Sequence, residues 1–325
     1  MQIGLFTAHE EYAPSTLIDH ARAGERAGFD TVWTSDHIHP WWHTDAHCGA
    51  AWPWLGTALA ETDHVAMGTG VTPPIGRYHP GMIAQTFATL GELFPGRVFF
   101  TLATGESMNE VPLGFEWPPY PARRERLIEA CEIITQLWTG EFITYAGDHW
   151  QTNSCKLYTL PSDPVPLYVA GNGPKTTEVA GRYADGFLTL VDIDRYEEQL
   201  VPALERGAAE VDRDPTEIKR IRQLLVSYGE DYDEALASTG FWRGVPAVGF
   251  DEEIPDPREI EAAGREYPFE KMAETWLVTT DPADIIDSLK ACEAAGFDEV
   301  EIHSASPDQH AFIEVMGDEV IPAFH

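Results

Sequence analysis

Residues 166–190 read PLYVAGNGPKTTEVAGRYADGFLTL, and this stretch contains one complete strand–helix–strand unit. A short apolar run at 166–171 leads into apolar residues at helical spacing over 174–183, and a second apolar run follows at 186–190. A strand, a helix and a further strand in this order form the repeating unit of parallel α/β folds. The stretch therefore predicts two parallel strands that are joined by a helix.

The same alternation runs along most of the chain. Further strands are predicted at 2–8, 31–36, 65–72, 98–105, 220–228 and 299–304, and further helices at 14–27, 51–61, 81–93, 121–137, 194–211 and 281–295. About eight such units favour a closed (β/α)8 TIM barrel, an α/β fold, over an open doubly wound sheet.

We expect one domain over residues 1–325, because no linker or change in composition marks a boundary. A two-domain α/β chain is the alternative. Two stretches fit the repeat poorly and are predicted to be insertions. The stretch at 141–160 has a hairpin-like order of residues, and the Pro- and acid-rich stretch at 241–268 is expected near the rim of the barrel.

Charge excludes two classes of partner. The 325 residues include 21 Lys and Arg against 54 Asp and Glu, a net charge of −33. This charge repels phosphate backbones and anionic lipids, so nucleic acid and membrane surfaces are not expected partners. With 43% hydrophobic residues, the chain can still build a packed core. The expected partner is a small molecule.

The sequence also predicts where the protein works. It shows no secretory signal and no apolar run that could span a membrane, and its four cysteines form no Cys-x-x-Cys pair, so we expect a cytoplasmic protein with reduced thiols. Surplus carboxylates occur throughout the chain, and molar salt would screen their repulsion. We therefore expect a halophilic source, with an acidic mesophile protein as the alternative.

The first candidate site is the polar and aromatic loop after the predicted strand at 31–36. It carries Asp36, His37, His39, Trp41 and a third histidine at position 43. A histidine can exchange a proton near neutral pH, and an indole offers an N–H donor with an apolar wall. A packed aromatic loop without chemistry is the alternative. No metal is expected, because the strand ends at 170–172 and 188–190 add no histidine to the pair at positions 37 and 39.

Carboxyl groups follow two other predicted strands. Glu106 lies in the segment 104–110 and is expected to point into the mouth of the barrel near His37, which would give an acid/base pair. Alternatively, Glu106 caps the next turn. Glu10, after the first predicted strand, is a third candidate with a weaker case, and its neighbour Glu11 is interpreted as the glutamate that faces solvent.

The segment 171–176 reads GNGPKT and follows the strand at 166–171. Glycines before a proline at the first helical position leave backbone N–H groups free at a helix start, which suits an anion. Lys175 and Thr176 lie in this first turn. An ordinary tight turn between a strand and a helix is the alternative. Together with the other two clusters on the same rim, the segment predicts a phosphate-bearing cofactor.

These segments resemble those of a known family, and the resemblance runs nearly from end to end. It rests on 35–41 (SDHIHPW), 77–80 (RYHP), 84–89 (AQTFAT), 95–98 (PGRV), 104–106 (TGE), 109–110 (NE), 173–174 (GP), 180–182 (AGR) and 185–187 (DGF). The chain resembles the luciferase-like oxidoreductases that depend on coenzyme F420, a deazaflavin. Within them it is most similar to the branch of secondary-alcohol and glucose-6-phosphate dehydrogenases.

The resemblance implies a deazaflavin across the barrel mouth, with hydride passing between a substrate carbon and the C5 atom of the ring. It implies that His37 exchanges the proton of the substrate hydroxyl, Trp41 holds that oxygen, and Glu10 lines the pocket. Glu106 would serve the N1 side of the cofactor or act as a second acid/base group. Cofactor contacts are implied for Asp36, Thr104, Gly105, Asn109, Asn172 and Gly173. A cis peptide between Gly70 and Val71 and a homodimer are also implied.

The expected substrate follows from one departure. Sugar-phosphate enzymes of this branch hold the phosphate with three cations, and the matching positions here are about Ile193, Asp251 and Thr275. Each lost charge-assisted contact is worth about 1.5–3 kcal/mol. The sequence therefore favours a secondary alcohol and its ketone. Alternatives are a free sugar or a sugar phosphate, an F420 carrier without catalysis, and a flavin-dependent monooxygenase.

Overall fold

The computed structural model describes residues 1–324. Its strands form one sheet in the order β6-β5-β4-β3-β2-β1-β9-β7-β8, and β6 also pairs with β7, which closes the sheet. Every registered pair of neighbouring strands is parallel, for example β1 with β2 and with β9. The predicted closed α/β barrel is confirmed. The chain divides into two compact units, which are described one at a time.

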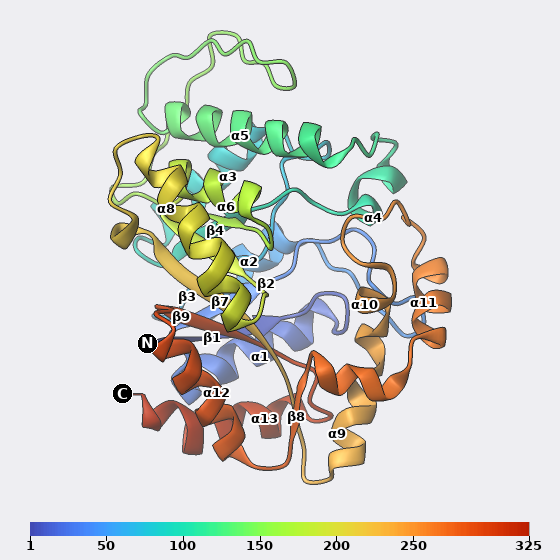
Figure 1. Cartoon of the computed structure of the whole chain (residues 1–325). Coiled ribbons are helices and arrows are strands. Elements are labelled where there is room, and N and C mark those ends of the chain that lie inside the picture. The colour runs from blue at the N-terminus through green and yellow to red at the C-terminus, as the bar shows by residue number, and fades with distance from the viewer. Residues whose placement is uncertain (325) are drawn as a thin grey trace. The chain divides into compact units, whose positions relative to one another are not determined.

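The first unit comprises Met1–Met67 and Arg220–His325. Its strands are β1 (Gln2–Thr7), β2 (Thr31–Thr34), β7 (Lys219–Tyr228), β8 (Leu277–Thr279) and β9 (Glu299–Ser304). Its α-helices are α1 (Pro14–Ala27), α2 (Ala51–Ala60), α9 (Tyr232–Ser238), α10 (Gly244–Val248), α11 (Pro257–Glu266), α12 (Pro282–Ala294) and α13 (Gln309–Val315). Helix α1 packs against α2 and α13, and the amino-terminal end of the chain lies near α12 (Figure 1).

Local chemistry explains the limits of α1. Pro14 occupies the first turn, where its missing N–H is not needed. The helix ends at Gly28, which adopts the left-handed conformation (φ 94°) and donates its N–H to Glu25 O. This conformation favours glycine because it has no Cβ.

The second unit comprises Gly68–Lys219. Its strands are β3 (Ala66–Thr69), β4 (Val98–Leu102), β5 (Leu167–Ala170) and β6 (Gly186–Thr189). Its helices are α3 (Pro80–Leu93), α4 (Ser107–Glu110), α5 (Tyr120–Leu137), α6 (Pro174–Tyr183), α7 (Ile193–Arg195) and α8 (Val201–Ala209). Helix α3 packs against α5, and α6 packs against α8. The loop after α5 projects away from that helix (Figure 1).

The structure adds detail to the predicted elements at three places. The predicted helix 194–211 is interrupted by a π-helical segment, Tyr196–Leu200, immediately before α8, which carries a proline in its first turn. The stretch 241–268, predicted as an insertion, contains the helices α10 and α11. A ninth strand, β8, escaped prediction because it has only three residues.

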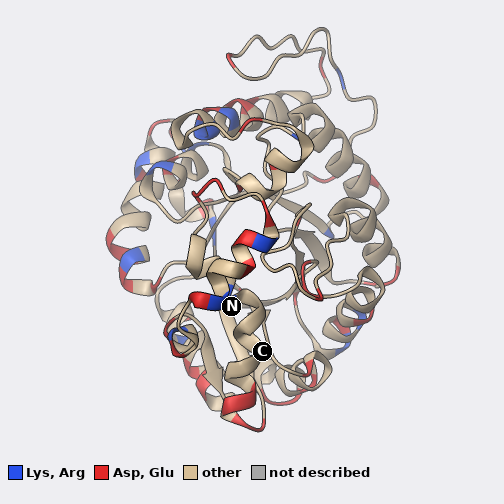
Figure 2. Cartoon of the chain, turned by 90° about the vertical axis from the view of Figure 1, so that its right-hand side faces the viewer, with Lys and Arg blue, Asp and Glu red and all other residues tan. Residues whose placement is uncertain are grey.

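Other expectations agree with the structure. Helices 14–27 and 174–183 and strand 299–304 have the predicted bounds. The insertion 141–160 is hairpin-like, with isolated antiparallel bridges between Ile143 and Cys155 and between Ala146 and Gln151. Acidic side chains are spread over many helices and loops (Figure 2). Within residues 1–324, no helix is both long and apolar enough to cross a membrane.

Candidate active site

The loops after β1 and β2 meet through a buried carboxylate. Glu10 is 2% exposed, and its Oε2 accepts a hydrogen bond from Ser35 Oγ at 2.5 Å. Ser35 Oγ in turn accepts from the backbone N–H of His9 at 2.9 Å. Ser35 therefore fixes the Glu10 carboxylate and ties the end of β2 to the end of β1.

His37 has an oxygen beside each ring nitrogen. Its Nε2 lies 3.5 Å from Glu10 Oε1, and its Nδ1 lies 3.3 Å from the carbonyl oxygen of His39. Neither oxygen can donate a proton, so each ring nitrogen faces an acceptor. The two contacts therefore fix the orientation of the His37 ring.

Trp41 forms an apolar wall beside this imidazole. The two ring centroids are 6.1 Å apart, and the Trp41 side chain is 5% exposed. Phe250 packs edge-on against Trp41, with the ring centroids 5.6 Å apart. Asp36 is 1% exposed at the end of the same strand. The structure thus gathers four predicted residues, Glu10, Asp36, His37 and Trp41, in the first unit.

Glu11 is a residue that sequence reasoning missed. It was expected to be the more exposed of the two glutamates, yet its Oε2 accepts from Trp242 Nε1 at 3.2 Å and its Oε1 from Tyr12 OH at 3.4 Å. Burial raises the pKa of Glu11 to about 7, against the opposing effect of the Trp242 hydrogen bond. No sequence signal distinguished it, because Trp242 lies 231 positions along the chain.

His303 is buried at the end of β9 among aromatic rings. Its ring is 4.3 Å from that of Trp242, 5.2 Å from Trp276 and 4.8 Å from Phe6, measured between centroids. Burial lowers the pKa of His303 to about 3, so the ring is neutral at any working pH. His303 therefore belongs to the packed wall of the first unit and not to a proton-transfer pair.

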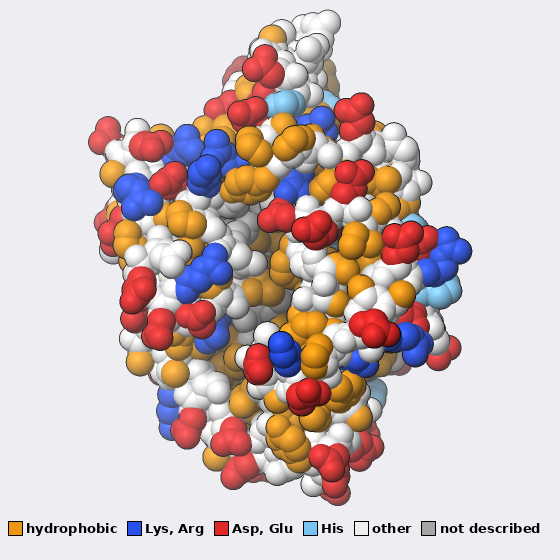
Figure 3. Space-filling view, turned by 45° about the vertical axis from the view of Figure 1, so that its right-hand side comes forward, with side chains coloured by type: hydrophobic (Ala, Val, Ile, Leu, Met, Phe, Trp, Pro, Cys, Tyr) orange, Lys and Arg blue, Asp and Glu red, His pale blue; other side chains and the backbone are white. Residues whose placement is uncertain are grey.

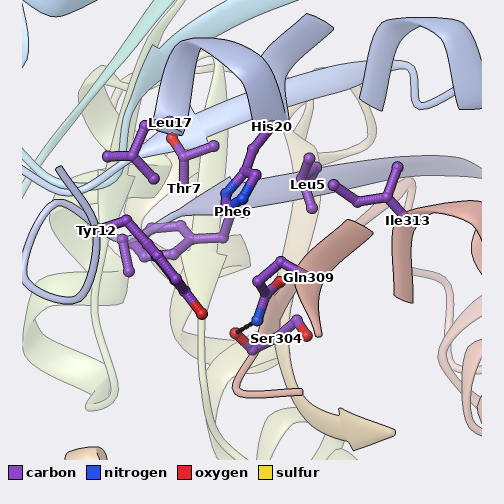
Figure 4. Close-up of a pocket in the computed structure, with 10 residues that line it drawn as sticks. Leu5, Phe6, Thr7, Tyr12, Leu17, His20, Ser304, Gln309 and Ile313 are labelled. Carbon is purple, nitrogen blue, oxygen red and sulfur yellow. Dashed lines mark hydrogen bonds between the residues drawn. The ribbon is translucent and has the colours of Figure 1, made fainter. Parts of the chain in front are cut away.

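A separate cavity of about 10 Å³ lies between β1, β9 and the helices α1 and α13 (Figure 4). Tyr12, His20 and Gln309 line it, and Gln309 Nε2 donates to Ser304 O at 3.0 Å. A space of this size holds one water molecule. It is too small for a substrate.

In the second unit, Glu106 follows β4 and is held by its neighbour. Its Oε2 accepts from Asn109 Nδ2 at 3.0 Å, and its side chain is half-buried. Glu106 occupies the position that caps α4, but its carboxylate makes no capping bond to the backbone. The carboxylate is therefore oriented by Asn109 and remains available to a ligand.

The loops after β3 and β4 each carry one special backbone feature. The Gly70–Val71 peptide is cis, as the resemblance implied. Gly105 has φ +69°, and a Cβ there would lie 3.0 Å from Pro73 and 3.1 Å from Ile75. Both conformation and space therefore require glycine at 105. Thr104 precedes it and is half-buried.

The loop after β5 is shaped by Asn172. Its Oδ1 accepts from Leu190 N at 3.0 Å and Thr189 Oγ1 at 3.1 Å, and its backbone oxygen accepts from Arg195 Nη2 at 2.7 Å. Arg195 is exposed, so it adds a positive charge beside the loop. Sequence reasoning did not identify Arg195, because it falls within a predicted helix.

Helix α6 begins directly after this loop. A Cβ added to Gly173 would meet no atom within 4 Å, so space opens in front of the helix start. Lys175 in the first turn is exposed, whereas Thr176 is buried and its Oγ1 lies 2.8 Å from Tyr120 OH. The open space, the backbone N–H groups of the first turn and the Arg195 cation fit a phosphate-bearing cofactor.

It stays a prediction that the site residues of the first unit and those of the second converge on one bound cofactor. Glu10, His37 and Trp41 lie in the first unit, whereas Glu106, Asn172 and Gly173 lie in the second. Among residues 1–324, no three His, Cys, Asp or Glu side chains gather in a way that could hold a metal ion.

Comparison with known proteins places the chain. The model of one family, described as luciferase-like monooxygenase, matches residues 1–299. The chain belongs to the luciferase-like family. Its barrel is accordingly the luciferase-like TIM barrel, as predicted.

Relatives within this family are named as F420-dependent enzymes. A protein of Beutenbergia cavernae, 41% identical over 99% of this chain and 97% of its own length, is named F420-dependent glucose-6-phosphate dehydrogenase. One of Microbacterium testaceum with the same name is 38% identical, with the same coverage of both chains. A solved F420-dependent secondary alcohol dehydrogenase, in complex with an F420-acetone adduct, matches with a TM-score of 0.95 at 36% identity, over 100% of this chain and 99% of its own.

Proposed function

We propose that this protein is a coenzyme F420-dependent oxidoreductase that interconverts a secondary alcohol and its ketone. The observation that carries the proposal is the placement of His37 between Glu10 Oε1 and the His39 carbonyl oxygen. Alcohol oxidation needs a base for the hydroxyl proton while the C–H hydrogen leaves as hydride, and this imidazole meets the first need. When bound, the deazaflavin supplies the hydride acceptor.

Each remaining residue has a proposed task. Trp41 holds the substrate oxygen against His37, and Glu10, fixed by Ser35, stabilises the protonated imidazole. Glu106 is the second acid/base group or serves the cofactor. Asp36, Gly70, Val71, Thr104, Gly105, Asn109, Asn172, Gly173, Lys175 and Thr176 are proposed cofactor contacts.

The charges near Trp41 support an uncharged substrate. Phe250 contacts Trp41, and exposed Asp251, Glu252 and Glu253 follow it directly. The cations of the same segment have partners of their own: Arg258 pairs with Asp256, Arg265 with Glu261, and Arg243 donates to two backbone oxygens. Carboxylates repel a phosphate dianion, so the charges near Trp41 disfavour a phosphorylated substrate. On the face of the molecule drawn in Figure 3, acidic and basic side chains are interspersed.

Glucose 6-phosphate is the second candidate, because the curated relatives carry the name of that activity. Identity near 40% preserves the reaction more readily than the substrate, since a few pocket residues set specificity. A free sugar would satisfy both the relatives' chemistry and the local charges. The three substrates therefore belong in one assay.

The test measures loss of oxidised F420 absorbance with 2-propanol, glucose or glucose 6-phosphate, in low salt and in molar salt. We expect turnover with 2-propanol, and a His37→Ala variant that still binds F420 but loses about 10²–10⁴-fold in kcat. Turnover with glucose 6-phosphate alone would establish the second candidate. F420 binding without any turnover would make the protein a carrier, and FMN binding with oxygen consumption would make it a monooxygenase.

Three broader expectations belong to the same proposal. We infer a cytoplasmic protein from a halophilic archaeon, supported by the net charge of −33, and a homodimer, supported by the resemblance alone. Sedimentation in molar salt tests the dimer. Loss of folding below molar salt would support the halophilic source.

A further inference from the structure

The segment 41–44, which follows the proposed catalytic histidine, is held by a single carboxylate from a distant helix. Glu261 lies in α11 and is 6% exposed. Its Oε2 accepts from the backbone N–H groups of Thr44 at 2.7 Å and His43 at 3.0 Å, and its Oε1 accepts from Thr44 Oγ1 at 2.8 Å. One side chain thus satisfies three donors of the loop.

The other contacts of this helix fit the same loop closely. A Cβ on Gly264 would lie 2.8 Å from the Trp42 ring, and a Cβ on Gly244 of α10 would collide with the backbone oxygen of Trp41. The guanidinium of Arg265 lies 5.5 Å from the centroid of the Trp42 ring. Helix α10 therefore packs closely against the backbone of Trp41, and α11 packs closely against the ring of Trp42.

The charge of Glu261 is secured from its own helix. Arg265 lies one turn later and donates its Nε to Glu261 Oε1 at 2.9 Å. Although burial opposes it, the hydrogen bonds from Arg265 and Thr44 lower the pKa of Glu261 to about 2. The carboxylate is therefore ionised at neutral pH.

We propose that Glu261 is a positioning residue that clamps the loop 41–44, and thereby sets the geometry of Trp41 relative to His37. The inference rests on the proposed function for its kinetic consequence. The segment 241–268 then serves as a buttress for the catalytic loop. A shift of about 1 Å in a group that orients the substrate costs on the order of a hundredfold in rate.

The test compares variants at one end of α11. Glu261→Gln keeps the size of the side chain but loses the charge and one of its two acceptor oxygens. We expect kcat with the best alcohol to fall on the order of tenfold to a hundredfold, the pH profile of kcat to change, and F420 affinity to stay within about twofold. Thr44→Val, which removes one loop donor, should give a smaller loss of the same kind.

Two matched controls separate positioning from helix stability. Glu259→Gln and Glu266→Gln make the same chemical change at exposed positions of α11 that do not contact the loop 41–44. Both should keep near wild-type kcat. An unchanged kcat and pH profile in Glu261→Gln, or an equal loss in Glu259→Gln and Glu266→Gln, would overturn the proposal.

Amide hydrogen exchange supplies a readout that does not depend on activity. In Glu261→Gln, the N–H groups of residues 43 and 44 should exchange on the order of tenfold faster or more, while those of β1 keep their protection. If the wild type shows no dehydrogenase activity but Glu261→Gln still exchanges faster than the wild type, the clamp stands and only the proposed function is refuted. Equal exchange in both proteins would refute the clamp whatever the activity.

Discussion

Replacing His303 with phenylalanine is expected to make the protein less sensitive to acid. Burial lowers the pKa of His303 from 6.5 to about 3, because the ring is 5% exposed and surrounded by aromatic side chains. Between these two values the unfolded chain binds a proton at this position and the native protein does not. The contribution to stability is therefore complete above pH 6.5 and is lost as the pH falls.

The magnitude follows from this difference. Each pH unit below 6.5 removes about 1.4 kcal/mol, so the wild type loses about 2 kcal/mol from this residue between pH 6.5 and 5. His303→Phe keeps a ring against Phe6 and Trp242, and any overpacking adds a cost of about 1–3 kcal/mol that does not depend on pH. From pH 6.5 to pH 5, the free energy of unfolding of the wild type should therefore fall by about 2 kcal/mol more than that of His303→Phe.

Urea unfolding at constant salt, at several pH values between 5 and 8, measures this difference. Carboxylates titrate in both proteins, so their contribution cancels in the comparison. A His47→Gln variant at an exposed position serves as control and should run parallel to the wild type. If the His303→Phe curve also ran parallel, the ring would titrate equally in both states and the argument from burial would be wrong.

Two further changes test the interior and the cofactor loop. Burial and the neighbouring Glu299 raise the pKa of Glu301 well above its usual value, so the native carboxyl keeps its proton where the unfolded chain releases it. The contribution of Glu301 to stability should thus fall as pH rises above about 4.5. Glu301→Gln, which keeps an acceptor for Gln223, should raise Tm more at pH 8 than at pH 5. Gly173→Ala should leave Tm nearly unchanged, because its Cβ meets nothing, yet weaken F420 binding on the order of tenfold. Unchanged F420 affinity would mean that the cofactor does not approach this loop.

The sequence predicted helix bounds correctly where a proline or a glycine marks the start or the end of the helix. Pro14 and Gly28 bracket α1, and Pro174 starts α6, so these bounds could be predicted. The alternation of strands and helices also predicted the barrel, because each strand–helix unit can be recognised from a short stretch of sequence. Helices α10 and α11 could not be predicted, since Pro- and acid-rich sequence is typical of loops and their stability comes from packing.

Burial of polar residues lay beyond prediction for a related reason. Strand β9 reads EVEIHS, an alternation typical of a strand with one wet face, yet all six residues are buried. Thr31 and Trp33 donate to Glu299, and Gln223 donates to Glu301. These partners lie on strands that are distant in sequence, so the sequence of β9 alone does not predict that its glutamates are buried. The same holds for Glu11 and Glu261.

The composition of the first unit has a consequence for synthesis. Strand β1 pairs with β9, so β1 lacks this neighbour until residues 299–304 have been made. Until β9 leaves the ribosome, one edge of β1 stays open to pairing with other nascent chains. The surplus of negative charge that accumulates along the growing chain is a built-in safeguard during this delay, because it keeps such chains apart.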